Sequence, residues 1–161
     1  FFHGHTYTGN PLACAAAAAN LDLFKSEKTL QKLRPKIAFL RQRLADFWQL
    51  QHVGDIRQAG FMVGIELVKD RASKTAYPAQ DRIGHAVVME ARGRGVILRP
   101  LGNVIVLMPP LSISRAELKL LLDVTYESIA AATKESPPMP ASRSASTMYN
   151  GRTRASVRTR G

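Results

Sequence analysis

Cysteine is almost absent from this chain, which has one, Cys14, among 161 residues. A single cysteine cannot form an internal disulfide and cannot supply a cysteine-rich metal cluster. The same scarcity is typical of proteins from a reducing compartment. We therefore expect a cytoplasmic protein with no metal site.

Long hydrophobic runs are missing as well. The longest strongly apolar stretch, Ala13 to Ala19, is far too short to cross a bilayer. The start of the chain has no basic segment followed by an apolar run and a cleavage site, so the pattern of a signal peptide is lacking. There is also no initiator methionine, and two aromatic residues lead straight into a loop. We expect the chain to be a piece of a longer protein.

Acidic residues are few, with 12 Asp and Glu against 23 Lys and Arg and a formal net charge of +11. Residues 136–161 contain five arginines and no acid, lack hydrophobic periodicity and are expected to form a disordered tail. The other charges are mixed in sign and have no aromatic platform beside them, which favours solvated helix faces. A non-catalytic basic module that binds nucleic acid through the tail remains an alternative function.

The hydrophobic spacing predicts an α+β fold, with long helices leading into a small antiparallel sheet that is covered by helices on one face. Its length and its 45% hydrophobic residues allow one domain with appendages. Strands are expected at 55–59, 62–68, 96–98 and 104–108, and a helix over 80–93.

Three further helices have recognisable ends. Asn10 and Pro11 suit the N-cap and first position of an alanine-rich helix that runs to about residue 24 and could pack closely on another element. A second helix is expected to start at residues 26–27, with Pro35 kinking or breaking it. Ser114 and Glu117 form a capping-box pattern before a last helix that ends near residue 133.

The residues before Asn10 combine glycines, histidines and threonines directly ahead of a helix N-terminus. Backbone N–H groups and hydroxyls in such a position suit a phosphate group. An ordinary loop followed by an N-cap accounts for the same residues. Residue chemistry alone leaves both interpretations open.

Three motifs in this order resemble the class III, fold type I pyridoxal-phosphate aminotransferases. They are Thr6-Tyr7-Thr8-Gly9-Asn10-Pro11-Leu12-Ala13-Cys14-Ala15, the stretch RQAGFMVGIEL at 57–67 and the stretch GVILRPLGNVIVLMPPL at 95–111. The resemblance covers about residues 1–133. It implies the C-terminal part of the fold, with 1–50 as the end of the large domain and linking helices, 51–135 as the small C-terminal α+β domain, and 136–161 as the tail.

The same resemblance implies a homodimer that binds pyridoxal 5′-phosphate. In the family, the lysine that bonds the cofactor lies upstream of these motifs, and no lysine of this chain has a matching context. We therefore assign no catalytic residue and expect the chain to be inactive alone. Thr6 is expected to hold the cofactor phosphate of the partner subunit through its hydroxyl and N–H, with His5 lining the same loop.

Arg99 is the candidate substrate-binding residue. A charge between the apolar residues 96–98 and Pro100 either points into a cleft or pairs with a local acid, and a guanidinium can hold a carboxylate with two hydrogen bonds. The motifs are most similar to family members of biotin biosynthesis, which transfer an amino group from S-adenosylmethionine to 8-amino-7-oxononanoate. The resemblance implies that Arg99 binds the carboxylate of that acceptor. A class III enzyme acting on another ω-amino acid or amine is the alternative within the family.

Other chemistry-bearing side chains are expected to have structural roles. We expect His52 and His85 at capping or surface positions, Glu66 outward or paired with an arginine, and Cys14 packed on its helix. Phe47 and Trp48 are expected in the core or between domains, and the corner Met108-Pro109-Pro110 is expected to shape the wall of the substrate site.

Overall fold

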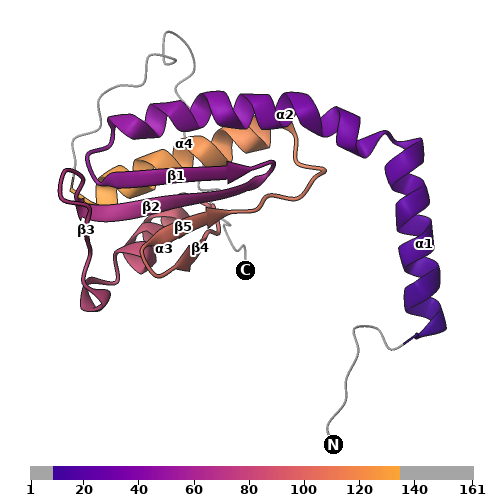
Figure 1. The fold of residues 1–161 in the computed structure, drawn as a ribbon, viewed down its shortest axis with the longest axis horizontal. Helices are drawn as coiled ribbons and strands as arrows, with labels where there is room; N and C mark the ends of the chain where they lie inside the picture. Colours follow the sequence, from indigo (N-terminus) through magenta and orange to yellow (C-terminus); the bar gives the residue numbers. More distant parts are fainter. Residues whose placement is uncertain (1–8, 135–161) are drawn as a thin grey trace, which may run out of the picture.

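The computed structural model describes residues 9–134 and has an α+β architecture (Figure 1). The residues before Gly9 and after Lys134, which include Thr6, His5 and the predicted tail, lie outside the described part. The helices are α1 (Pro11–Ser26), α2 (Thr29–Leu44), α3 (Ile83–Gly93) and α4 (Arg115–Ala132), with short 3₁₀ helices at Ala45–Gln49 and Ala79–Asp81. The strands are β1 (Val53–Ala59), β2 (Met62–Asp70), β3 (Thr75–Ala76), β4 (Arg99–Leu101) and β5 (Val104–Leu107).

Every strand pair of the described sheet is antiparallel, as expected. The strands lie in the order β1-β2-β5-β4, and β3 pairs with the end of β2. Side chains alternate between the two faces of a strand. On β2 and β5 the buried residues Val63, Ile65, Ile105 and Leu107 therefore define the core face.

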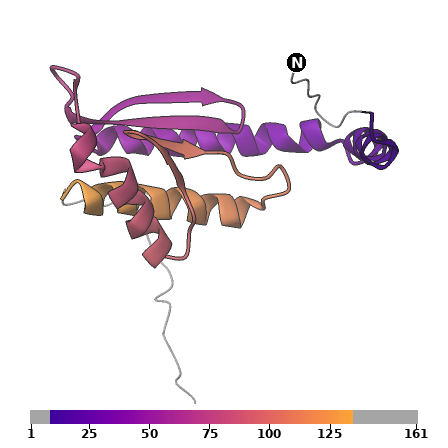
Figure 2. The same cartoon turned by 90° about the horizontal axis from the view of Figure 1, so that it is seen from below.

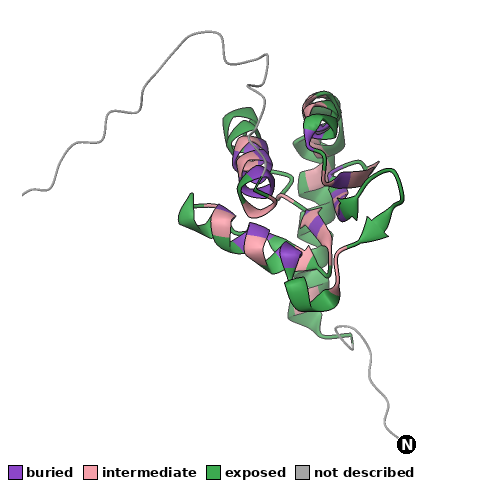
Figure 3. Cartoon of the chain, turned by 90° about the vertical axis from the view of Figure 1, so that its left-hand side faces the viewer, coloured by how far each residue is buried: buried purple, intermediate pink, exposed green. Residues whose placement is uncertain are grey.

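Helices cover only this core face. Figures 1 and 2 show α3 and α4 on one side of the strands, with α2 running along the β1 edge. The three helices contribute Leu40, Val87, Leu118 and Leu122, all fully buried, and the buried positions gather where helices and strands face one another (Figure 3). The opposite face of the sheet is left open by the described residues.

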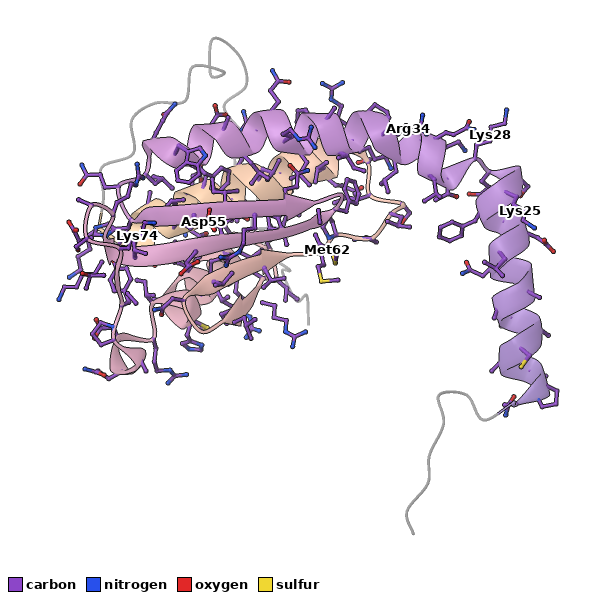
Figure 4. All side chains as sticks on the ribbon, in the orientation of Figure 1. Lys25, Lys28, Arg34, Asp55, Met62 and Lys74 are labelled. Atoms are coloured by element: carbon purple, nitrogen blue, oxygen red, sulfur yellow. The ribbon has the colours of Figure 1, made fainter. Side chains whose placement is uncertain are left out.

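Helix α1 is unlike the others, because no residue of it is buried in the described structure. A sharp corner separates α1 from α2, and at this corner Lys28 adopts a left-handed backbone with φ of 53° (Figure 4). The close packing expected of an alanine-rich helix is therefore not found within the described chain. Cys14, expected to be packed, is exposed.

Several predicted boundaries need correction. Residues 26–27 end α1 rather than start α2, which begins at Thr29 after the corner, and Pro35 lies within a helix that continues on both sides. The strand expected at 96–98 lies instead at Arg99–Leu101, and the predicted loop after residue 68 contains the end of β2 and the short strand β3. None of the described helices is long and apolar enough to cross a membrane.

Candidate functional site

The sequence places Arg99 at the start of β4, and two features of the chain decide how its side chain is presented. Pro100 follows it, and a residue before proline is disfavoured in helical conformations, so the backbone of Arg99 is held extended. Arg99 pairs in register with Val106 of β5, whose neighbours Ile105 and Leu107 are the core-facing residues. Residues directly opposite each other point to the same face, so Arg99 belongs to the open face of the sheet.

A groove of about 420 Å³ lies beside this arginine. Its other lining residues are apolar: Ile97, Leu98, Val106, Met108, Pro109, Pro110, Ile113 and Leu121. Arg99 is exposed, and its guanidinium has no hydrogen bond or ion pair with any residue between Gly9 and Lys134. The local acid that would make it an ordinary strand-edge arginine is therefore not among the described residues.

A second arginine on the same face behaves differently. Four residues form one row across the sheet, one from each strand, in the order Arg57 (β1), Gly64 (β2), Val106 (β5) and Arg99 (β4). The two arginines are the ends of this row. The Nη1 atom of Arg57 donates to Glu66 Oε2 at 2.9 Å and to Asp55 Oδ2 at 3.1 Å. Figure 4 labels Asp55 on this part of β1. Of the two positions expected for Glu66, outward or paired with an arginine, the structure shows the pair. Arg57 is therefore neutralised, whereas Arg99 has no acidic partner among residues 9–134.

The N-terminus of α1 has no free amide in its first turn for binding an anion. Asn10 Oδ1 accepts hydrogen bonds from the N–H groups of Leu12 at 3.0 Å and Ala13 at 3.1 Å, and its carbonyl accepts from Cys14 N at 2.9 Å. Pro11 has no N–H, so every amide of the first turn is already used. A bound phosphate would have to be held by residues that precede Asn10. The candidates Thr6 and His5 are in that position, and both lie outside the described residues.

The remaining polar candidates have the structural surroundings expected of them. His52 Nδ1 lies 2.9 Å from the carbonyl of Val68, and the ring packs beside Tyr77. His85 is exposed on α3. Phe47 is buried edge-on against the ring of Tyr126, with 5.4 Å between centroids.

Trp48, expected in the core or between domains, does not lie in the core of the described chain. The residue is 44% exposed, and the guanidinium of Arg71 lies 5.7 Å from the centroid of its ring. The corner Met108-Pro109-Pro110 does form one wall of the Arg99 groove.

Residues from α2 and α4 that support this groove were not recognised from the sequence. Leu121 lines it, and Lys36 Nζ donates to the carbonyl of Leu111 over 3.1 Å, across 75 positions of the chain. Leu121 carries only the apolar spacing of an ordinary core residue, and Lys36 is one of many charges on a helix face. Neither pattern distinguishes them from their neighbours.

Comparison with known proteins identifies the family of this chain. Residues 2–129 match the family model described as aminotransferase class-III. The chain therefore belongs to the class-III aminotransferase family.

Among its relatives is the adenosylmethionine-8-amino-7-oxononanoate aminotransferase of Nitratidesulfovibrio vulgaris, 59% identical over 134 residues, or 83% of this chain and 25% of the relative. A solved structure of the enzyme of the same name from Methanocaldococcus jannaschii matches with a TM-score of 0.76 and 46% identity, covering 81% of this chain and 30% of the other. An aminotransferase from Vibrio fluvialis in its PMP-bound form also matches with a TM-score of 0.76, at 30% identity, over 84% of this chain and 30% of that one. The chain thus spans less than a third of these relatives.

Proposed function

We propose that this chain is part of a transaminase of biotin biosynthesis, which transfers an amino group from S-adenosylmethionine to 8-amino-7-oxononanoate to give 7,8-diaminononanoate. The observation that carries the proposal is Arg99, which has no partner among residues 9–134 and lines a groove whose other lining residues are apolar. The acceptor combines a terminal carboxylate with a run of methylene groups. A guanidinium suits the first and an apolar wall the second.

The cofactor belongs to the same proposal. Family membership and the PMP-bound relative support pyridoxal 5′-phosphate, which when bound supplies the electron sink for amino transfer. We place its phosphate beside Thr6 and His5, because the amides of the first turn of α1 are occupied by Asn10. The homodimer implied by the resemblance and the cytoplasmic location expected from the scarcity of cysteine belong to the proposal as well.

A second candidate within the family is a transaminase of another ω-amino acid or amine. The M. jannaschii structure matches this chain with a TM-score of 0.76 and that of an omega-transaminase from Thermomicrobium roseum with 0.75, so the fold does not separate the two candidates. The identities of 46% and 36% favour the biotin-pathway substrate.

The test uses the complete protein that contains this chain, assayed for 7,8-diaminononanoate with S-adenosylmethionine as donor. Arg99→Ala should raise the KM for 8-amino-7-oxononanoate by about tenfold or more, because a charge-assisted, bidentate contact is lost. The KM for the donor should change less than twofold. Arg92→Ala, an exposed arginine on α3 away from the groove, is the matched control and should leave both constants unchanged.

Two results would count against the proposal. A wild-type protein that forms no 7,8-diaminononanoate but transaminates ornithine or 4-aminobutyrate would establish the second candidate. An unchanged KM in Arg99→Ala would remove Arg99 from the substrate site while leaving the reaction itself in place.

A further inference from the structure

One wall of the Arg99 groove is a segment with little backbone bonding of its own. Met108, Pro109, Pro110 and Ile113 line the groove from this segment, which joins the end of β5 to the start of α4. Its two prolines have no N–H and cannot donate to a neighbouring strand. Within it, one backbone hydrogen bond closes a turn, from Ile113 N to Pro110 O at 3.0 Å. The position of this wall must therefore come from contacts with other elements.

Helix α2 supplies those contacts at two points one turn apart. Lys36 Nζ donates to Leu111 O at 3.1 Å, in the middle of the segment. Phe39 lies three positions further along α2, on the same helix face, and the guanidinium of Arg115 sits over its ring at 4.7 Å. Arg115 is the first residue of α4, so α2 holds both the segment and the helix that follows it.

The surroundings of Lys36 restrict the movement of its side chain. Lys36 is half-buried, whereas Lys32 one turn earlier is exposed. The Lys36 charge is also close enough to help keep the pKa of Glu117 below its usual value, after the larger effect of the hydrogen bonds between Glu117 and Ser114. The ammonium group thus donates to the Leu111 carbonyl and also acts electrostatically on the carboxylate of the capping box.

We infer that Lys36 is a positioning residue for the substrate site: by holding the Leu111 carbonyl, it sets how far the Pro109-Pro110 wall stands from Arg99 and so how well an unbranched aliphatic carboxylate fits. The inference rests on the proposed function, since it takes Arg99 as the carboxylate-binding group. Lys36 is not among the residues that line the groove, so its effect reaches the groove through the segment it holds.

The test uses three variants in the complete protein. Lys36→Met keeps the length of the side chain and loses the donor, Lys36→Arg keeps a donor, and Lys32→Met removes an exposed charge from the same helix. Lys36→Met should raise the KM for 8-amino-7-oxononanoate by about fivefold, because a misplaced wall weakens binding without removing a reacting group. The kcat and the KM for the amino donor should change less than twofold. The KM of Lys36→Arg for the acceptor should stay within twofold of the wild-type value. The KM of Lys32→Met should equal the wild-type value.

A general loss of folding would lower kcat and weaken the donor and acceptor alike, and that result would overturn the inference. So would a Lys36→Met protein with an unchanged KM for the acceptor. If the wild-type protein does not use this acceptor, the proposed function fails, but the inference about Lys36 can still be tested. The affinity for nonanoate, measured through the side-chain N–H resonance of Arg99, then replaces the KM. Equal nonanoate affinity in wild type and Lys36→Met would overturn the inference, and affinity about fivefold weaker would support it.

Discussion

Arg43 of α2 donates from Nη2 to Asp123 Oδ1 of α4 across 2.6 Å, and this ion pair ties together two helices that are 80 positions apart in the chain. The Arg43 side chain is only 12% exposed and the Asp123 side chain 22%. Lys119 bonds the other oxygen of the same carboxylate, and Asp46 lies 3.5 Å from Arg43 Nη1.

Asp123→Ala should lower the free energy of unfolding by about 2 kcal/mol, because it leaves the mostly buried Arg43 without its principal partner. Urea unfolding followed by circular dichroism measures this. The control is Asp22→Ala, whose partner Lys25 is 4.0 Å away on the exposed surface of α1. That change should be within about 0.5 kcal/mol of zero. Equal effects at the two positions would contradict the argument.

Two glycines of α3 should respond in opposite ways to alanine. A Cβ on Gly84 would lie 2.2 Å from the carbonyl oxygen of Gly102, which is backbone and cannot move aside cheaply, so Gly84→Ala should cost about 2 kcal/mol or more. A Cβ on Gly93 meets nothing within 4 Å. Gly93→Ala should stabilise the protein by about a few tenths of a kcal/mol, because alanine has a higher helix propensity than glycine. Thermal unfolding of the two variants and of the wild-type protein measures both changes in stability.

Stability should fall as the solution is acidified. Hydrogen bonds from the side chain and N–H of Ser73 lower the pKa of Asp70, and those from Ser114 lower the pKa of Glu117. A carboxyl whose pKa is lower in the folded state stabilises that state above its unfolded pKa and loses the effect as pH falls through the folded value. The urea midpoint should therefore drop from pH 5 to pH 3, and less steeply in the double variant Asp70→Asn, Glu117→Gln. An identical slope in the double variant would rule out these two groups as the cause.

Arg99→Lys separates charge from geometry at the proposed substrate site. Lysine keeps the positive charge but lacks the planar fork that bonds both oxygens of a carboxylate. The KM for 8-amino-7-oxononanoate in the complete protein should lie between those of wild type and Arg99→Ala. A lysine variant equal to wild type would mean that charge alone is recognised.

Local signals in the sequence predicted much of this fold correctly. The Asn10 N-cap and the Ser114–Glu117 capping box are present with the expected hydrogen bonds, because both depend on residues within one turn. The strand predicted at 96–98 was displaced because its position depends on pairing. Gly102 and Asn103 form the turn that places Arg99 opposite Val106. The β propensity of single residues does not predict which residues of two strands pair.

The site could be predicted only where its residues are close in sequence. Arg99 stood out because a charge interrupts an apolar run next to Pro100. In the structure it lines an apolar groove and has no partner among the described residues. Lys36 could not be found in this way, since its partner Leu111 is 75 positions away. The roles of Thr6 and His5 stay predictions, because both residues lie outside the described part of the chain.

The strand that carries Arg99 also bears on self-association. β4 lies at the end of the described sheet, and an exposed strand edge is where a second polypeptide can add by backbone pairing. This edge is three residues long, and its central residue, Pro100, has no N–H to offer an incoming strand. The proline that keeps the arginine extended therefore also discourages aggregation at that edge, and its replacement should make concentrated protein more prone to form fibrillar or amorphous precipitate.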